Sequence, residues 1–164
     1  MKYKCIKNFL KQDEFKYLKS VIDDNNFPWF YNDRQTHYDN NDRFFFSHIF
    51  YTEGKENSSY FKLLDVFLKK LKVKKLISVR MNLITKDTNK QHVSHLHVDQ
   101  QIKNCKTAIY YMNTNNGFTY LKADKDIKVL CEENKIFIFD SKIEHASVSQ
   151  TDENKRIVIN FNYI

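Results

Sequence analysis

The chain has 164 residues, of which 41% are hydrophobic and 15% aromatic, so it can fold as one domain with its own core. This composition excludes a disordered chain, and no apolar run approaches the ~20 residues of a membrane-spanning helix. The net charge of +7, from 27 basic against 20 acidic residues, is spread along the sequence. We interpret it as a generally basic surface, which supports a nucleic-acid partner only weakly.

The start of the chain, "MKYKCIKNFLKQDEF", has scattered lysines and no continuous apolar stretch, so it does not read as a secretory signal. The three cysteines are an odd number and form no CxxC pair. This pattern argues against a disulfide framework and a cysteine zinc site. Together these features predict a cytoplasmic protein.

Two amphipathic helices are expected in the N-terminal part. The first covers residues 13–24, where apolar side chains recur at spacings of three and four and acidic residues occupy the first turn. It ends before Pro28. The second covers residues 58–71, with Ser58 or Ser59 as its N-cap and lysines in its last turn.

Short runs rich in β-branched and aromatic residues follow residue 74, and polar turns separate them. The runs are "LISVRMNLI", "TAIYYMN", "FTYL", "IKVL", "KIFIFD", "HASVS" and "RIVINFNYI". Helices followed by many short strands predict an α+β chain, mainly β, with a β-sandwich or jelly roll as its core. We expect a single domain over 1–164, in which residues 1–75 form a helical support and residues 76–164 the β core.

The stretch "QHVSHLHVDQ" holds three of the six histidines of the chain and an aspartate. Alternate residues of an extended chain face the same way, so His95, His97 and Asp99 could converge on one metal site. Two ligand pairs then compete, His95 with His97 or His97 with Asp99. The histidine His92 lies at the start of the same stretch.

A metal site needs further ligands, and His145 follows the strand-like run "KIFIFD". With His97 and Asp99 it would form a triad of two histidines and one carboxylate, which leaves iron positions open. Arg156 lies eleven residues after His145. Its guanidinium could bind a carboxylate through two parallel hydrogen bonds.

With these residues the chain resembles the 2-oxoglutarate and Fe(II)-dependent oxygenases of the prolyl 4-hydroxylase-like type, and in particular small members from phages and large DNA viruses. The resemblance covers about residues 76–163. It rests on "HVDQ", "TAIYYMNTNNGFTYL" and "IFIFDSKIEHASVSQTDENKRIVINFNY".

The resemblance implies a double-stranded β-helix, or jelly roll, with the N-terminal helices packed on it. It implies His97, Asp99 and His145 as ligands of Fe(II), and Arg156 as the residue that binds the distal carboxylate of 2-oxoglutarate. Thr119 and Tyr110 are further candidates for cosubstrate binding, although "YY" leaves open which tyrosine faces inward. The usual glycine pair before the threonine is here "NG".

The implied reaction uses 2-oxoglutarate and O2 to hydroxylate a C–H bond, with succinate and CO2 as coproducts. A protein or peptide side chain, such as proline, is the expected substrate, and the host cytosol the expected location if the chain is viral. A nucleobase or a small molecule remains an alternative. Membrane association is not expected, and the oligomeric state is left open.

Two alternatives use the same histidines differently. A cupin-type site would pair His95 with His97 and needs a glutamate four positions later, where the chain has Gln101. A non-catalytic jelly roll would bind without chemistry and would leave the spacing of Asp99, His145 and Arg156 to chance. The other histidines, His37, His48, His92 and His95, are expected to be structural or to lie at the pocket rim, with "YNDRQTHYDNNDRFFFSH" forming a lid or strand near the substrate.

Overall fold

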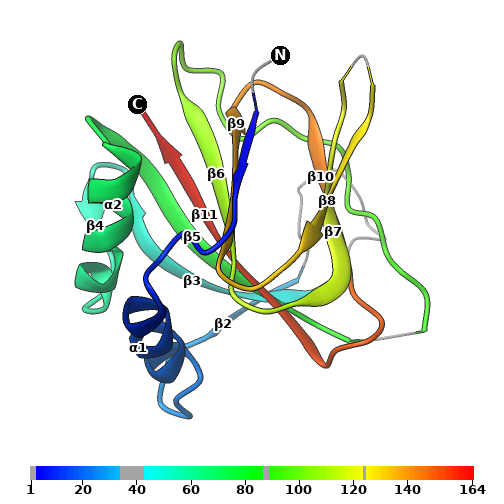
Figure 1. Cartoon of the computed structure of the whole chain (residues 1–164), viewed down its shortest axis with the longest axis horizontal. Coiled ribbons are helices and arrows are strands. Elements are labelled where there is room, and N and C mark those ends of the chain that lie inside the picture. The colour runs from blue at the N-terminus through cyan, green and yellow to red at the C-terminus, as the bar shows by residue number, and fades with distance from the viewer. Residues whose placement is uncertain (1–2, 34–42, 87–88, 124) are drawn as a thin grey trace.

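The computed structural model describes residues 3–33, 43–86, 89–123 and 125–164. Two antiparallel sheets face each other, and helices cover the outer face of the larger sheet (Figure 1). This arrangement confirms the predicted mainly-β jelly roll with N-terminal helices packed on it.

The larger sheet contains eight strands, seven of which follow one path of neighbours. In spatial order these are β1 (Lys4–Ile6), β9 (Lys135–Asp140), β6 (Lys106–Tyr111), β11 (Lys155–Tyr163), β5 (Leu76–Thr85), β3 (Phe45–Thr52) and β2 (Phe30–Asn32); β4 (Lys55–Glu56) pairs with β3.

The smaller sheet has the order β10 (His145–Val148), β7 (Asn115–Leu121) and β8 (Ile127–Cys131). Two single bridges, Val93 to Val148 and His97 to His145, place the segment 93–97 beside β10. This segment therefore lies along the free edge of the smaller sheet, next to β10.

Strand β11 explains how one element can serve both the core and a polar interior. Successive side chains of a strand point to opposite faces. Ile157, Ile159 and Phe161 belong to the cluster under the helices, whereas Arg156 and Val158 point between the two sheets. The same alternation continues on the neighbouring strands β5 and β6.

Helix α1 (Gln12–Ile22) buries Phe15, Leu18 and Ile22, which are the residues that its sequence pattern predicts. The second predicted helix differs from expectation. It begins with a 3₁₀ turn (Phe61–Leu64) and continues as the short helix α2 (Asp65–Leu71). Such turns are common at helix ends.

The N-terminal part contains four strands in addition to its helices. The longest, β3, pairs with β5 and extends the larger sheet. Its residues Phe46, His48 and Phe50 alternate with residues that face the other side, so the run "FFSHIFYT" satisfies the period of a strand. The described part of residues 1–75 therefore contributes strands to the larger sheet as well as helices.

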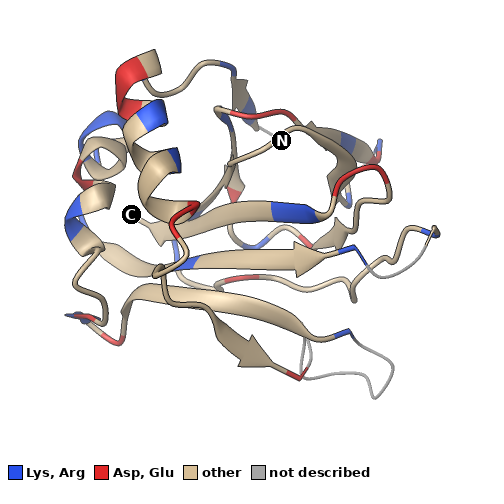
Figure 2. Ribbon diagram, turned by 90° about the horizontal axis from the view of Figure 1, so that it is seen from below, with Lys and Arg blue, Asp and Glu red and all other residues tan. Residues whose placement is uncertain are grey.

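Charged side chains are dispersed over the molecule. Figure 2 shows Lys and Arg together with Asp and Glu along the helices, loops and strand ends. Several of them pair, such as Lys155 with Asp23 at 2.6 Å and Lys122 with Glu144 at 2.7 Å. Within the described ranges, no helix is both long and apolar enough to span a bilayer.

The cluster under the helices depends on Phe67, which is fully buried and contacts the rings of Phe9, Tyr110 and Phe161. Replacing Phe67 by Ala removes these contacts and leaves a cavity, so we expect a loss of about 3–5 kcal/mol in the free energy of unfolding. Denaturant unfolding measures it. The exposed Tyr17 on α1 is the control, and Tyr17→Ala should change stability by no more than about 0.5 kcal/mol.

Candidate metal centre and adjoining pocket

The backbones of His97 and His145 are hydrogen-bonded to each other. The His97 amide donates to the His145 carbonyl at 3.0 Å, and the His145 amide donates to the His97 carbonyl at 2.9 Å. This reciprocal pair is the hydrogen-bonded register of antiparallel strands, which puts both side chains on the same face. The two ring centroids lie 4.5 Å apart.

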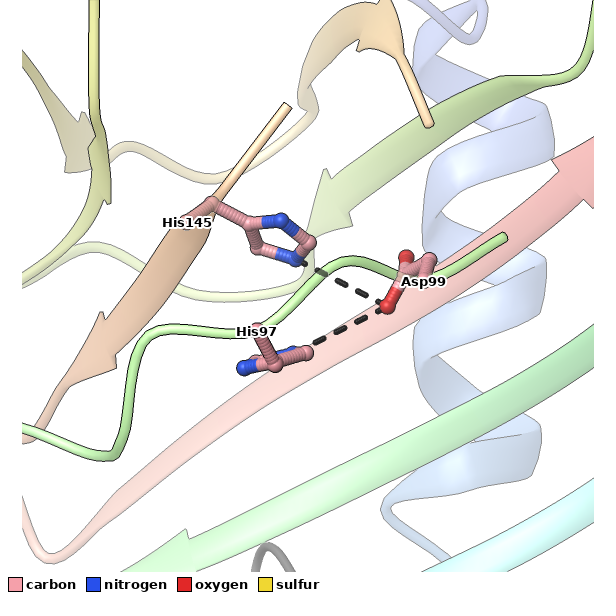
Figure 3. A group of neighbouring side chains, drawn as sticks. All are labelled: His97, Asp99 and His145. Atoms are coloured by element: carbon pink, nitrogen blue, oxygen red, sulfur yellow. Dashed lines mark ion pairs between the residues drawn. The ribbon is translucent and has the colours of Figure 1, made fainter. Parts of the chain in front are cut away.

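Asp99 completes the group, and all three side chains point toward a common centre (Figure 3). Its Oδ1 atom lies 3.7 Å from Nε2 of His97 and 3.7 Å from Nε2 of His145. The side chains of His97, Asp99 and His145 are 28%, 10% and 4% exposed. The site is therefore enclosed by protein on the side of His145 and reachable on the side of His97.

The other nitrogen of each imidazole faces a backbone carbonyl. His97 Nδ1 lies 3.0 Å from the carbonyl of His95, and His145 Nδ1 lies 3.1 Å from that of Ile143. A carbonyl can only accept, so each Nδ1 carries the hydrogen and each Nε2 keeps its lone pair. Both rings are thus held in the tautomer that can bind a metal at the centre.

The second oxygen of Asp99 is held by two neighbours. Its Oδ2 atom accepts a hydrogen bond from Nδ2 of Asn160 at 3.0 Å and lies 3.0 Å from the hydroxyl of Thr107. These contacts leave Oδ1 facing the histidines. They also fix the orientation of the carboxylate from strands β11 and β6.

The protonation states suit metal binding. Burial tends to raise the pKa of Asp99, but His145, the hydrogen bond from Asn160, His97 and Thr107 together bring this pKa below its ordinary value. For His145, burial lowers the pKa despite the nearby Asp99. An ionised carboxylate and a neutral imidazole are the forms that coordinate metal ions.

His97, Asp99 and His145 form the group of possible metal ligands found among the described residues, with one ligand atom from each lying within 4.8 Å of the others. Two imidazoles and one carboxylate on one side of an ion is the facial arrangement typical of non-haem Fe(II). The donor set and the fixed tautomers therefore fit iron.

A pocket adjoins this centre between the two sheets. It is lined by both histidines and by residues of β3, β5, β6, β7, β10 and β11, among them Thr119, Ser147 and Arg156. Arg156 is 2% exposed. A buried cation without an acidic partner is costly, so its place in this pocket requires an anion or a strong set of acceptors.

Two acceptors orient the guanidinium of Arg156. Its Nε donates to the Cys131 sulfur at 3.1 Å, and Nη1 donates to the Ser147 hydroxyl at 2.9 Å. An arginine side chain has five N–H groups, and the bonds to Cys131 and Ser147 use two of them, so three remain. They are available for a carboxylate that enters the pocket.

Gly117 makes room for the stem of Arg156. A Cβ atom at Gly117 would lie 2.9 Å from Cδ of Arg156, 2.9 Å from the Val148 carbonyl and 2.8 Å from Oδ1 of Asn115. The chain therefore needs a glycine at this position of β7. The glycine of "NG" is explained by the approach of the arginine.

Thr119 and Tyr110, the two further candidates for cosubstrate binding, lie on opposite sides of the larger sheet. Thr119 lines the pocket and is within 2.8 Å of the hydroxyl of Tyr111. Tyr110 lies on the opposite face of β6, where it packs on Phe9 and its hydroxyl donates to Asn134 at 2.9 Å. The tyrosine that faces inward is Tyr111, because the alternation of β6 sends Thr107, Ile109 and Tyr111 between the sheets.

The remaining histidines have other surroundings. His48 is buried under the helices between the Pro28 carbonyl, at 2.8 Å, and the Ser58 hydroxyl, at 2.7 Å, which is a structural role. His92 and His95 are not among the residues that line the pocket. His37 lies outside the described residues.

Sequence reasoning missed the residues that orient the ligands, which are Thr107, Asn160, Cys131 and Ser147. A signal was present for Asn160. In "RIVINFNY" the polar residues Arg156, Asn160 and Asn162 fall on alternate positions of a strand, so they share one face.

Comparison with family models gives no match, and no curated protein matches the sequence. Solved structures do match. A 2OG-Fe(II) oxygenase family oxidoreductase from Burkholderia pseudomallei has a TM-score of 0.74 at 8% identity, covering 98% of this chain and 84% of that one. A prolyl-4-hydroxylase from Pseudomonas putida has a TM-score of 0.67 at 13% identity, with coverages of 98% and 91%.

A third match is a prolyl hydroxylase from Trichoplax adhaerens in complex with a peptide fragment of hypoxia inducible factor. Its TM-score is 0.65 at 12% identity, and the match covers 98% of this chain and 83% of that one. At such identities the likeness shows a shared fold. The chain has the double-stranded β-helix of structures described as 2-oxoglutarate and Fe(II) oxygenases.

Removing the support of Asp99 should weaken metal binding without unfolding the protein. In Asn160→Ala the carboxylate loses a donor, so we expect affinity for Mn(II), measured by calorimetry, to fall about 10–100-fold. The matched control is Asn57→Ala, because Asn57 is exposed and its side-chain amide donates to the Lys55 carbonyl, away from the metal ligands. Equal affinities in the two variants would contradict the assigned role of Asn160.

Proposed function

We propose that the protein is an Fe(II)- and 2-oxoglutarate-dependent dioxygenase that hydroxylates a C–H bond. The observation that carries this proposal is the placement of His97, Asp99 and His145 beside a pocket that contains the buried Arg156. The triad would hold the metal and the arginine would bind a carboxylate. A 2-oxo acid with a second carboxylate is the cosubstrate that such a pair of sites can hold at once.

His97, Asp99 and His145 would bind Fe(II) through Nε2, Oδ1 and Nε2. When bound, Fe(II) with 2-oxoglutarate and O2 would supply oxidation of a C–H bond, with succinate and CO2 as coproducts. The contribution of the chain is geometric. The carbonyls of His95 and Ile143 hold both imidazoles in the tautomer with hydrogen on Nδ1. Asn160 and Thr107 keep the Asp99 carboxylate oriented toward the ion.

Arg156 would bind the distal carboxylate of 2-oxoglutarate with the N–H groups left free by Cys131 and Ser147. Thr119 lines the pocket, and its hydroxyl accepts a hydrogen bond from the fully buried Tyr111 at 2.8 Å. Burial raises the pKa of Tyr111 well above its ordinary value, so its phenol stays protonated and can donate. We propose that Thr119, oriented by Tyr111, adds a hydroxyl contact to the same carboxylate.

A protein or peptide side chain, such as proline, is the substrate class that we propose. The support is the fold shared with two prolyl hydroxylases, of which the one from Trichoplax adhaerens is described in complex with a peptide fragment. A cupin-like site is the alternative. Against it, His95 is exposed and lies outside the metal group, while its carbonyl faces the ring of His97.

The first prediction of this proposal concerns cofactor binding. Fe(II) with 2-oxoglutarate should raise the melting temperature, since ligands that bind only the folded state stabilise it. Succinate should form slowly even without a substrate. His97→Ala, Asp99→Ala and His145→Ala should each abolish turnover. No shift and no succinate would leave a non-catalytic jelly roll, and loss of metal in His95→Ala but not in Asp99→Ala would favour the cupin pairing.

The second prediction separates cosubstrate binding from metal binding. Arg156→Ala removes the carboxylate partner, so the Kd for 2-oxoglutarate should rise about 10–1000-fold, in line with the loss of a buried charged hydrogen bond. Gly117→Ala should act in the same direction because its Cβ would meet the arginine stem at 2.9 Å. Mn(II) affinity without 2-oxoglutarate should stay unchanged in both variants. A parallel loss of Mn(II) binding would show damage to the fold.

A further inference from the structure

The pocket contains a second arginine, which the proposed reaction does not use. Arg80 lies on β5 and lines the same pocket as Arg156. In the sheet, Arg156 pairs with Ile84 and Asn160 pairs with Arg80. Four residues of a strand span about 13 Å. The two arginines therefore enter the pocket from well-separated positions, and Arg80 lies level with the residue that holds Asp99.

Arg80 is exposed and its guanidinium lies over the ring of Phe45, with the carbon 5.6 Å from the ring centroid. Phe45 is itself buried, so it provides a fixed surface for the flat cation. No residue in the described ranges forms a hydrogen bond or ion pair with this guanidinium. Asp99 is the nearby acid, but its oxygens already face Asn160, Thr107 and the two histidines.

Two amide oxygens in the pocket have no donor in the described ranges. Oδ1 of Asn82 and Oδ1 of Asn160 are buried and have no hydrogen-bond partner among the described residues. The orientation of Asn160 is fixed, because the ionised Asp99 can only accept and so must face Nδ2. Buried acceptors without partners cost free energy, and each needs an explanation.

These three side chains share one side of the pocket, formed by β5 and β11. They present a guanidinium fork and two acceptors, none of which has a hydrogen-bond partner within the part of the chain that the structure describes. A fork of this kind recognises a carboxylate through two parallel hydrogen bonds, and amide oxygens recognise N–H groups. A ligand with a carboxylate and neighbouring N–H groups would pair with the guanidinium and these acceptors, whereas a purely apolar ligand would leave them unpaired.

We propose that Arg80 binds the carboxylate of the primary substrate and that Asn82 and Asn160 accept hydrogen bonds from its N–H groups. The substrate is then an α-amino carboxylate, supplied either by a free amino acid or by the C-terminal residue of a peptide. This inference rests on the proposed function, because it takes the Arg156 end of the pocket as the cosubstrate site. It specifies the substrate as a molecule that carries an α-carboxylate beside the C–H bond to be hydroxylated.

The experiment uses the full chain loaded with Mn(II) and saturating 2-oxoglutarate, whose affinities are measured first. The probes form two arms, the common L-amino acids and a pool of short peptides, each tested as the free acid and as the C-terminal amide. Binding is measured by ligand-observed NMR. Succinate formation with Fe(II) is measured in parallel. The variants are Arg80→Gln and Arg80→Lys.

The matched control is Lys128→Gln. Lys128 is also an exposed cation over an aromatic ring, 4.0 Å from the centroid of Phe118, but it lies on β8 and does not line the pocket. We expect at least one free acid to bind and its amide to fail. Arg80→Gln should weaken that binding at least about tenfold, as expected for loss of a charged hydrogen-bond pair, with Arg80→Lys in between and Lys128→Gln unchanged.

Three results would overturn the inference. These are equal binding of acids and amides, the absence of binding by any free acid in either arm, and a rise in the Kd of 2-oxoglutarate in Arg80→Gln as large as in Arg156→Ala. The last would assign Arg80 to the cosubstrate. The affinities for Mn(II) and 2-oxoglutarate are measured before any amino acid is added. If the unaltered protein bound neither, the proposed function itself would fail, and this result is distinct from failure of the inference. The arm that responds tells a free amino acid from a peptide terminus.

Discussion

The strict alternation of side chains along β11 is the constraint on which the rest of the molecule depends. Every second residue of this central strand enters the apolar cluster beneath α1 and α2, and the residues between them enter the polar interior. One strand thus ties the packing of the helices to the position of Arg156 and Asn160. A shift of one residue would exchange the two sets and would lose core and site together.

Much of this could be predicted from the sequence, because the β core gives local signals. The strands after residue 74 are short, β-branched and aromatic, and the structure has a strand at each of the seven predicted runs. The ligand candidates His97, Asp99 and His145 do converge. The separation of 46 positions between Asp99 and His145 did not prevent this prediction, because the sequence motif includes both residues.

Other features depend on tertiary contacts and left no local signal. The inward face of β6 is decided by its neighbours, so "YY" did not reveal that Tyr111, and not Tyr110, points between the two sheets toward Thr119. Cys131 and Ser147 meet Arg156 only because β8 and β10 flank β7. The segment that contains the start of β3 was predicted only as a lid or a strand, although the side chains of β3 alternate between two faces as those of a strand do.

The reciprocal backbone bond between His97 and His145 has a consequence for how the site comes apart. The segment 93–97 is attached to the smaller sheet by single bridges and not by a continuous ladder. Local opening of that segment would therefore move His97 away from His145. An ion bound to both residues would oppose this opening. Amide hydrogen exchange at His97 and His145 should accordingly slow together when metal is added, and this edge of the sheet would be an opening unit whose stability is set by metal concentration.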